Sequence, residues 1–418
     1  QVGTGELWSE IATLATDSAS NTTKFFVMSD IQGGDLDNVK ALAANIEKGG
    51  YNFGIQTGDS IDNVTSYSQV ATAVDLLGTN ILSDMDMVRV LGNHEFYGDP
   101  NGDLVSALYN VPNTAAGTGY SVTYGDVYVA TIHFTNTAAE LEAAMDWLEQ
   151  DAKASNATWK VLAMHQPPYY TNAVGGNGPI HEMVPAVCEA AGIDVVFSGH
   201  DHSLARTNQL TAGELDEENG VLYYIGGSCG EKSYPITSQT VFDFDKIFGL
   251  KPTLEYTATY IGVEADDLKM TLKIYDVMAD GTKAQVDSYT LYTEMGACDR
   301  DGHVLDEAVY DRAIGKVICN ACGMAVDPVA ANYTDWATDK ETGRKMYLIS
   351  GEPQTGAFIF GEDTYYFDEE GVALQGKVEW EEVELEFDNG TVVGGYTGFV
   401  TKNDGKLYTF VSNHPLGG

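Results

Sequence analysis

Basic residues are scarce in this 418-residue chain, where 22 Lys and Arg stand against 62 Asp and Glu and the formal net charge is −40. A surface of that sign repels a phosphate backbone, which argues against a general nucleic-acid surface. We interpret the acidic excess as a solvated surface suited to the outside of a cell or to a salty medium. Additional calcium sites are an open alternative.

Long apolar runs are also missing. No stretch approaches the ~18 residues that a membrane helix needs, although 44% of the residues are apolar, as in a globular protein. The chain starts at Gln1 rather than Met, without the basic start and apolar stretch of an export signal. We therefore expect a processed protein with no membrane span, whose signal has been removed or is not included in this sequence.

Cysteine is rare, and the odd count of five is too low for a disulfide scaffold. Cys188 falls in a predicted core helix and Cys229 in a Gly-rich loop, where we expect free buried thiols. The late cysteines form C-x4-H followed by C-x2-C, a pattern that could close a structural zinc site. A disulfide between the last two cysteines, with the first one free, is an equally supported alternative. The four residues concerned are Cys298, His303, Cys319 and Cys322.

Short apolar strands alternate with amphipathic helices from Phe25 onward, which predicts an α/β fold. The helices are expected at residues 36–48 and 140–155. The strands are expected at residues 24–30, 51–59, 87–93, 120–134, 159–166, 193–202 and 221–228. After Leu254 the helical signals end, and β-strands within residues 256–277 and 285–293 are expected to close the first domain near Thr293. Reactive groups gather at the carboxyl ends of strands in such sheets, so we expect one common site there.

Five of these strand ends carry nearly all the Asp and His residues that could bind metal. A pair of hard cations beside a phosphate needs oxygen ligands, with one carboxylate able to bridge, and imidazoles to fix the geometry. A lone Asp usually caps a turn, and a lone His such as His133 usually packs, but five strand ends in this order are hard to obtain by chance. The candidate ligands are Asp30, Asp59, Asn93, His165, His200 and His202.

In this order the segments resemble those of the calcineurin-like metallophosphoesterases, over about residues 24–294. The segments HQPPYYT, GHDHSLART and VLYYIGGSCGEKSY, and the helix before His165, resemble the purple acid phosphatase branch. The resemblance implies a four-layer sandwich of two mixed β-sheets flanked by helices, with a dinuclear metal centre at the strand ends. The metals would be two divalent or trivalent ions, chosen from zinc, manganese, iron and calcium.

The resemblance also implies roles. It assigns Asp59 as the bridge, Asp30 and His202 to the first metal, and Asn93, His165 and His200 to the second. His94 would face the leaving group and donate a proton or hydrogen bond, so that His94 and Asp59 form the catalytic pair. Glu95 would either orient the His94 imidazole or lie at the surface.

Two positions depart from the resembled patterns. Calcineurin-like members place a His two residues after the first Asp, where this chain has Gln32. Purple acid phosphatases place a Tyr three residues after the second Asp, where this chain has Asp62. An amide oxygen is a weaker ligand than imidazole, so the first metal would be looser or a harder ion, and a purple colour is not expected. Asp62 would bind through water or, as we favour, cap the following segment.

Three further residues are candidates for contact with the substrate. Arg206 and His181 could contact a phosphate or its leaving group, against the commoner fates of a salt bridge or a solvated loop. Tyr169 follows the Pro pair beside His165 and could stack on a substrate, although packing is as frequent a role for such a residue.

The last part of the chain is rich in Gly, Tyr and acidic residues and repeats itself, because residues 333–351 match residues 396–413. Between the copies, TYYFDEEGVALQG predicts a β-hairpin that turns at residues 368–371. These segments resemble the cell-wall-binding repeats of Gram-positive surface proteins, whose aromatic hairpins stack on sugars or choline. The implied partner is a cell-wall glycan or teichoic acid, and the plain core of a small β module is the equal alternative.

We therefore predict four segments: an N-terminal extension (1–23), a metallophosphoesterase domain (24–294), a Cys/His-containing linker or zinc-ribbon-like element (295–329) and a β-hairpin repeat module (330–418). The predicted function is a secreted hydrolase of phosphate monoesters or diesters that uses a metal-activated hydroxide. The alternative is a surface-binding or scaffold protein with a partly degenerate phosphoesterase domain. The expected location is secreted from, or on the surface of, a Gram-positive bacterium.

Overall fold

The structure is a computed structural model, in which the chain divides into two compact units, Gln1–Thr293 and Glu294–Gly418. The residues it describes are 3–4, 7–8, 22–32, 37–71, 85–105, 111, 119–135, 137–171, 178–230, 232–236, 247–248, 258–361, 363–380, 383–394, 398–401, 407–411 and 414–415. Most of the predicted N-terminal extension, residues 1–2, 5–6 and 9–21, therefore lies outside the described residues.

Two mixed β-sheets form the centre of the first unit. Within its described residues, one sheet has seven strands in the order β14-β10-β13-β9-β8-β7-β6, and the other has six in the order β17-β16-β15-β3-β4-β5. The strands of the first sheet are β6 (Gly119–Tyr124), β7 (Val127–Ile132), β8 (Trp159–Met164), β9 (Val195–Ser198), β10 (Leu204–Thr207), β13 (Leu222–Gly226) and β14 (Ile247–Phe248). Those of the second are β3 (Thr23–Met28), β4 (Phe53–Gln56), β5 (Asp86–Arg89), β15 (Ala258–Ala265), β16 (Lys269–Val277) and β17 (Lys283–Tyr292).

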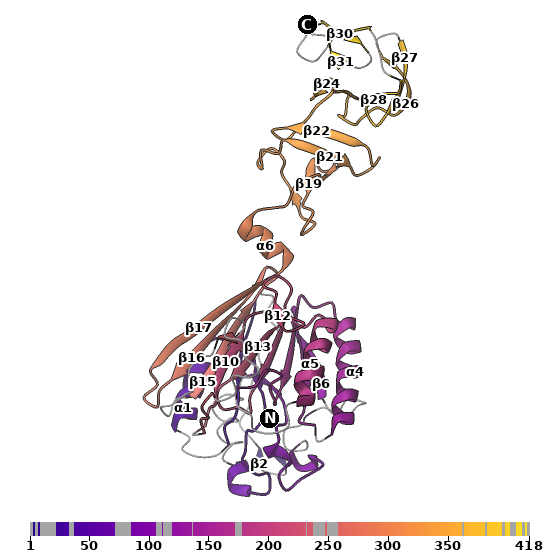
Figure 1. Ribbon diagram of the computed structural model, residues 1–418. Coiled ribbons are helices and arrows are strands. Elements are labelled where there is room, and N and C mark those ends of the chain that lie inside the picture. Colours follow the sequence, from indigo (N-terminus) through magenta and orange to yellow (C-terminus); the bar gives the residue numbers. More distant parts are fainter. Residues whose placement is uncertain are drawn as a thin grey trace. The chain divides into compact units, whose positions relative to one another are not determined.

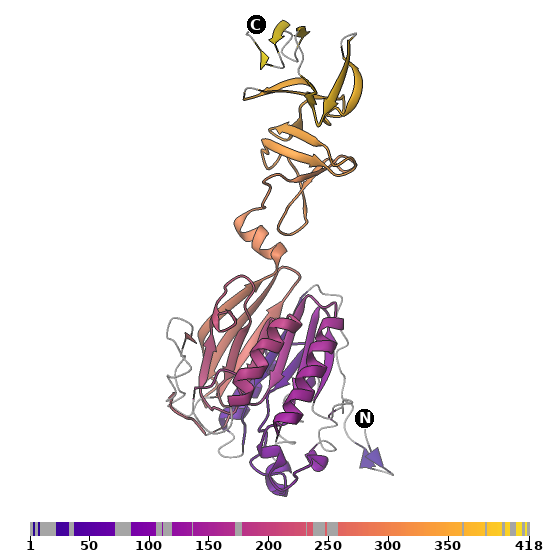
Figure 2. The same ribbon diagram turned by 45° about the vertical axis from the view of Figure 1, so that its right-hand side comes forward.

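Helices cover the outer faces of both sheets. Helices α4 (Ala138–Ala154) and α5 (Gly178–Ala191) lie side by side on the seven-stranded sheet (Figures 1 and 2). Helix α1 (Asp37–Glu47) packs on β15 and β16 of the other sheet. Separate apolar clusters fill the space between the sheets and the space under each helical layer. The predicted four-layer sandwich is confirmed.

The strand β7 illustrates why the sequence forms these layers. Successive side chains of a strand point to opposite faces, so Val127 and Val129 enter the core between the sheets, while Tyr128 and Ala130 pack under α4 and α5. A strand that is covered on both faces is expected to be apolar throughout, and every residue of β7 is buried.

The predicted helices and the late β region are found in the structure. Helix α4 begins after Thr137, whose Oγ1 accepts a hydrogen bond from the Glu140 backbone N–H at 3.2 Å. Its buried residues, Leu141, Ala144, Met145, Leu148 and Ala152, recur at the spacing of one helical face. Strands β15, β16 and β17 extend the six-stranded sheet as an antiparallel meander from β3. Among the residues described, no helix is long and apolar enough to cross a bilayer.

The second unit consists of α6 (Glu294–Asp301) and short sheets. Its described strands are β18 (Val309–Asp311), β19 (Lys316–Ile318), β20 (Ala325–Val326), β21 (Asp335–Asp339), β22 (Lys345–Ile349), β23 (Glu352–Pro353), β24 (Gly356–Phe360), β25 (Asp363–Phe367), β26 (Gly376–Trp380), β27 (Val383–Asp388), β28 (Thr391–Val392), β29 (Gly398–Thr401), β30 (Leu407–Val411) and β31 (His414–Pro415). The two copies of the sequence repeat form equivalent antiparallel hairpins, β21–β22 and β29–β30. Residues 396–397, 402–406 and 412–413 of the second copy lie outside the described residues.

The hairpin predicted within residues 364–376 is present but short. The turn itself is present, with the Gly371 backbone N–H bonded to the Asp368 carbonyl at 3.1 Å. Across it, the Asp368 N–H donates to the Val372 carbonyl and the Leu374 N–H to the Tyr366 carbonyl, both at 2.9 Å, around an antiparallel bridge between Phe367 and Ala373. The longer pairing of β25 is with the preceding β24. The returning segment enters an apolar core, where the buried Val372 packs with Met346.

Candidate metal centre

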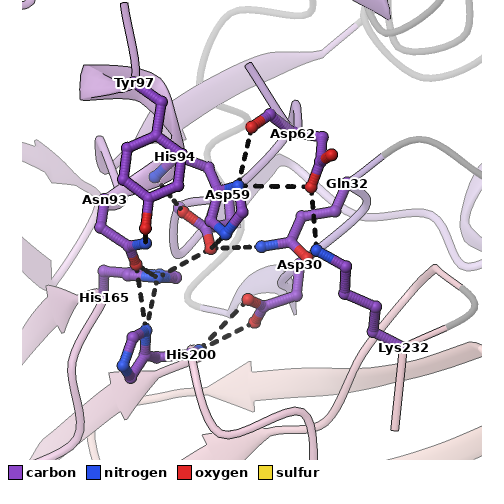
Figure 3. Close-up of polar contacts among 12 residues, drawn as sticks. Asp30, Gln32, Asp59, Asp62, Asn93, His94, Tyr97, His165, His200 and Lys232 are labelled. Atoms are coloured by element: carbon purple, nitrogen blue, oxygen red, sulfur yellow. Dashed lines mark hydrogen bonds and ion pairs between the residues drawn. The ribbon is translucent and has the colours of Figure 1, made fainter. Parts of the chain in front are cut away.

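The six candidate ligands follow the carboxyl ends of neighbouring strands. Strands β3, β4 and β5 are parallel, and Asp30, Asp59 and Asn93 come soon after them. Strands β8 and β9 are parallel in the other sheet, and His165, His200 and His202 follow them. The structure brings these side chains together at one end of the sandwich, and Figure 3 shows how five of them point toward one another.

The Asp59 carboxylate lies at the centre of the cluster. It belongs to two groups of potential ligand atoms, one with His165 and His200 and one with Asp30 and His202. Within each group the ligand atoms lie within 4.8 Å of one another. The Asp59 Oδ2 atom is 3.2 Å from His165 Nε2, and the Asp30 Oδ1 atom is 3.4 Å from His202 Nε2. Asp59 is thus the residue that the two groups share.

Asn93 completes the group that contains the two histidines. Its Oδ1 atom is 3.1 Å from both His165 Nε2 and His200 Nδ1. Its Nδ2 atom donates to the Tyr97 hydroxyl at 3.0 Å, which holds the amide with its oxygen toward the imidazoles. The oxygen is therefore presented as a third ligand beside two nitrogens.

Backbone carbonyls fix the orientation of two of the imidazoles. His165 Nδ1 lies 2.8 Å from the Thr57 carbonyl oxygen, and His202 Nδ1 lies 3.3 Å from that of Lys232. A ring that donates from Nδ1 to a carbonyl keeps the lone pair on Nε2, the nitrogen that faces the carboxylates. Both rings therefore turn Nε2 toward the carboxylates, which is the orientation that a metal ligand needs.

The buried carboxylates of this site favour a positive charge between them. Burial raises the pKa of the fully buried Asp30 to about 7. Burial acts the same way on Asp59, but the charge and hydrogen bond of His165 outweigh it and hold the pKa of Asp59 below its usual range. Burial disfavours a charged His165, yet the nearby carboxylates raise its pKa to about 10. A positive charge among the buried carboxylates is thus strongly favoured.

The donor set fits metal ions. The Gln32 Oε1 atom is buried and has no hydrogen-bond partner among the described residues, while Gln32 Nε2 donates to Asp59 Oδ2 at 2.5 Å. Two carboxylates, an amide oxygen from Asn93 and three imidazoles offer the oxygen and nitrogen ligands that zinc, manganese and iron accept.

The backbone around the site is strained. Left-handed φ angles from 42° to 67° occur at five non-glycine residues of the cluster, namely Asp30, Gln32, Asp59, His200 and His202. Such conformations are uncommon outside glycine and concentrate at functional sites. Two glycines permit the close approach of the loops. A Cβ atom on Gly199 would lie 2.4 Å from Asp30 Oδ2, and one on Gly92 would lie 2.3 Å from Asp59 Oδ1.

Comparison with known proteins agrees with this geometry. Residues 23–204 match the sequence model of the family described as calcineurin-like phosphoesterase. The first unit therefore contains a calcineurin-like metallophosphoesterase domain. Over 232 residues the chain is 23% identical to purple acid phosphatase 4 of Arabidopsis thaliana, which covers 48% of this chain and 68% of that relative. Over 167 residues it is 27% identical to purple acid phosphatase 15 of the same plant, covering 37% of this chain and 31% of the relative.

A solved structure shares the fold of the metallophosphoesterase domain. It is the purple acid phosphatase PPD1 from yellow lupin (Lupinus luteus) seeds, which superposes with a TM-score of 0.51 at 16% sequence identity. The match covers 67% of this chain and 55% of the lupin chain. This chain thus spans little more than half of that protein, and the likeness concerns the fold.

His94 lies at the edge of the cluster in the phosphoesterase domain. Its Nδ1 atom is 2.8 Å from the Asp62 carbonyl oxygen and 3.3 Å from the Asp62 Oδ1 atom. Its Nε2 atom lies 3.8 Å from Asp59 Oδ2, so the other side of the ring faces the candidate ligands. The side chain is partly exposed, which leaves it accessible to a substrate.

The favoured capping role of Asp62 is wrong. Its carboxylate faces His94 and accepts from Lys232 Nζ at 2.8 Å (Figure 3). The following segment is capped by the neighbouring Asn63, whose Oδ1 accepts from the Thr65 backbone N–H at 2.9 Å. Lys232 was missed in the sequence, where it stands out only as the Lys of the segment GEKSY.

Glu95 has a different role from both that were expected. It is fully buried rather than at the surface, and its carboxylate bonds groups other than the His94 ring. Its carboxylate accepts from the backbone N–H groups of Asp59 (2.9 Å), Ser60 (2.7 Å) and Gly92 (2.8 Å). Glu95 therefore joins the loops that follow β4 and β5, and it fixes the position of Asp59 through the Asp59 backbone.

The three candidate substrate contacts are engaged elsewhere. Arg206 is buried, with Nε 2.6 Å from Asp287 Oδ2 and its guanidinium over the Tyr289 ring. Residues 204 and 206 of β10 share one strand face, and Leu204 lies in the core between the sheets, so Arg206 points into that core.

Tyr169 packs in the layer under the helices, and His181 of α5 contacts its ring. The Tyr169 ring is buried, and its centroid lies 4.7 Å from that of the Tyr223 ring and 5.0 Å from that of the His181 ring. His181 Nδ1 is 2.9 Å from the Pro168 carbonyl oxygen. Tyr169 is therefore part of the protein core, and the half-buried His181 is engaged by the Tyr169 ring and the Pro168 carbonyl.

Proposed function

We propose that the first unit is a metal-dependent phosphoesterase that holds two metal ions at the carboxyl ends of its strands. Asp59 would bridge them, with Asp30 and His202 on one side and Asn93, His165 and His200 on the other. The observation that carries this proposal is the position of Asp59, the carboxylate that belongs to both groups of potential ligand atoms among the described residues. The match of residues 23–204 to a phosphoesterase family supports it independently.

Metal ions in such a site polarise the phosphoryl oxygens and lower the pKa of a bound water. Hydrolysis forms a bond from the water oxygen to phosphorus and breaks the bond from phosphorus to the leaving oxygen. His94 is placed to donate a proton to that oxygen, since its Nε2 atom faces the cluster while Asp62 accepts from its Nδ1 side. Lys232 neutralises Asp62 beside the ring.

The choice between monoesters and diesters is tested together with the reaction. We expect the purified chain, loaded with manganese or zinc, to hydrolyse p-nitrophenyl phosphate, bis(p-nitrophenyl) phosphate, or both. His200→Ala should lower kcat/KM by at least ~100-fold and lower the metal content measured by mass spectrometry, because a ligand to one ion is lost. His181→Ala is the matched control, since that imidazole lies outside the cluster.

Two outcomes would overturn the proposal. A wild-type chain that binds no added metal has no such centre, and a His200→Ala variant with full activity would place the reaction elsewhere. If metal is bound but neither ester is turned over above background, the alternative of a scaffold protein with a degenerate phosphoesterase domain is favoured.

For the second unit we propose attachment to a cell-wall glycan or teichoic acid, which would place the enzyme outside the cell. The support is an aromatic cluster on the first copy of the repeat. The centroid of the Trp336 ring lies 5.1 Å from that of Tyr347, 4.7 Å from that of Tyr365 and 5.3 Å from that of Phe360. The Phe360 side chain is exposed. Aromatic faces at a surface are suited to stacking on sugar rings or quaternary ammonium groups.

Co-sedimentation with purified Gram-positive cell walls tests the attachment. We expect the chain to pellet with the walls and Trp336→Ala to pellet several-fold less. Tyr67→Ala, at a largely exposed aromatic residue of the first unit, is the control and should bind as the wild type does. Wild-type chain that stays in the supernatant would disprove this function of the repeats.

A further inference from the structure

Four metal ligands converge at the beginning of the second unit. They are Cys298, His303, Cys319 and Cys322, and their ligand atoms all lie within 4.8 Å of one another. The first two come from α6 and the loop after it, and the last two come from the turn between β19 and β20. Residues 21 positions apart in the chain thus meet, with Cys298 Sγ 3.7 Å from Cys319 Sγ.

The distances fit a metal rather than a disulfide. All five cysteines are unbridged, and a separation of 3.7 Å between sulfurs far exceeds the ~2.05 Å of a disulfide bond. Sulfurs bound at ~2.3 Å to a tetrahedral zinc lie ~3.7–3.8 Å apart, and a sulfur and an imidazole nitrogen lie ~3.6 Å apart. Cys322 Sγ is 3.6 Å from His303 Nδ1. Both separations are those of the edges of a zinc tetrahedron.

The backbone holds the two ligand-bearing loops in this arrangement. In the turn, the Gly323 N–H donates to the Cys319 carbonyl at 2.9 Å, and the left-handed Gly323 (φ 70°) suits a residue without Cβ. In the other loop, the Gly302 N–H donates to the Cys298 carbonyl at 2.9 Å. A bond of 2.9 Å from the Asn320 N–H to the Val304 carbonyl ties the loops together.

Apolar packing contributes little to fixing α6 within the second unit. Its buried residues are Gly296 and Cys298, so no large apolar side chain of the helix is fully buried. The adjacent core is small and comprises Ala308, Tyr310, Val317, Tyr333, Ala337, Met346, Leu348 and Val372. Small units with little apolar burial commonly depend on a metal or disulfides for stability.

We propose that Cys298, His303, Cys319 and Cys322 bind a structural zinc ion that joins α6 to the β19–β20 turn. Three sulfurs and one imidazole nitrogen form a closed tetrahedral set, which leaves no position for a substrate and marks the site as structural. Soft thiolate ligands select zinc over the harder ions that suit the carboxylate-rich centre of the first unit. The zinc site therefore has a structural role and takes no part in the proposed phosphoesterase reaction.

Cobalt substitution in the full chain tests the site, because only a cobalt–thiolate site gives an intense near-ultraviolet charge-transfer band. We expect wild-type chain to show this band and to lose it in Cys319→Ser. His200→Ala should keep it, since the first metal centre has no thiolate. Cys188→Ala, at a buried cysteine outside the cluster, is the matched control and should keep the band. His303→Cys should retain zinc, because it replaces one zinc ligand by another.

Thiol counting and zinc K-edge absorption distinguish a zinc–thiolate site from a disulfide. Zinc-loaded wild type should show sulfur neighbours at ~2.3 Å, and the denatured chain should titrate as five free thiols. Three free thiols would reveal a disulfide, and a reduced chain without the cobalt band would lack the site; either result overturns the proposal. Phosphoesterase activity that persists in Cys319→Ser separates this outcome from any failure of the first centre.

Discussion

At the scale of single residues, Gln32 sets this metal centre apart from the families it resembles. Its side chain is almost fully buried, and its amide nitrogen contacts Asp59 where the resembled pattern supplies an imidazole. A neutral amide can present either nitrogen or oxygen at the same position, so it tolerates both an occupied and a metal-free site. An imidazole there would add a stronger ligand beside Asp30 and His202.

Gln32→His should therefore tighten metal binding at the group formed by Asp30, Asp59 and His202. We expect the dissociation constant of the more weakly held manganese or zinc ion to fall by ~10-fold. Changes in the residues around a metal site commonly alter metal affinity by this much. Calorimetric titration of the metal-free chain measures it. Gln32→Leu, which supplies no donor, should weaken binding instead. Equal affinities in all three proteins would show that position 32 does not touch the metal.

Asp194 gives the fold a dependence on pH that is separate from the metal centre. Burial raises the pKa of this carboxyl to about 7, although its Oδ2 atom accepts from the Lys160 backbone N–H at 2.7 Å. Because the pKa is higher in the folded state than in the unfolded chain, folding favours the protonated acid. The stability of the folded state is thus undiminished below pH ~4 and falls as the pH rises through 7.

Asp194→Asn should remove this loss. The amide oxygen can still accept from Lys160 and carries no charge at any pH. We expect the variant to be more stable than the wild type by ~1–2 kcal/mol at pH 8 and equal to it at pH 4, as measured by urea unfolding. The exposed Asp126→Asn should match the wild type at both pH values. A gain of the same size at pH 4 would mean that ionisation is not the cause.

At the scale of elements, an ion pair between Arg206 of β10 and Asp287 of β17 joins the two sheets of the sandwich. Both side chains are nearly buried, at 9% and 11% exposure, and the Nε–Oδ2 distance is 2.6 Å. Removal of one partner from a buried pair leaves the other charge without compensation, which costs more than the pair itself contributes. The contact therefore constrains how the sheets pack.

Arg206→Ala should destabilise the first unit by ~3 kcal/mol and leave kcat/KM of the folded enzyme unchanged. Thermal unfolding and turnover of p-nitrophenyl phosphate, measured below the transition, check the two parts of this expectation. The double variant Arg206→Met with Asp287→Leu should recover much of the lost stability, since neither charge remains. A strong rise in KM at unchanged stability would restore the interpretation of Arg206 as a substrate contact.

At the scale of the whole molecule, a net charge of −40 opposes folding into compact units through repulsion among surface carboxylates. Raising the ionic strength from ~0.01 M to ~1 M shortens the screening length from ~30 Å to ~3 Å. We expect the unfolding temperature at pH 7 to rise by a few degrees with sodium chloride in this range. Near the isoelectric point, where the charge vanishes, the same salt should have little effect; an equal rise there would exclude repulsion as the reason.

The sequence by itself determined the layered fold and the convergence of the candidate ligands. Both depend on local signals: apolar strands of fixed period, and Gly-Asp, Gly-Asn-His and Gly-His segments directly after them. Parallel strands carry their ends to the same edge of a sheet. The order of these segments is therefore enough to place Asp30 and Asp59 close together at the end of one sheet, and His165 and His200 at the end of the other.

Only the tertiary structure decided the contacts that cross from one loop or sheet to another. Glu95 bonds the loop after β4, Asp62 meets Lys232 from a loop 170 residues later, and Arg206 meets Asp287 across the sandwich. Each depends on the register of strands and the packing of layers, which residue order does not encode locally. The separations of the late cysteines and of His303 likewise became visible only when α6 and the β19–β20 turn were folded together.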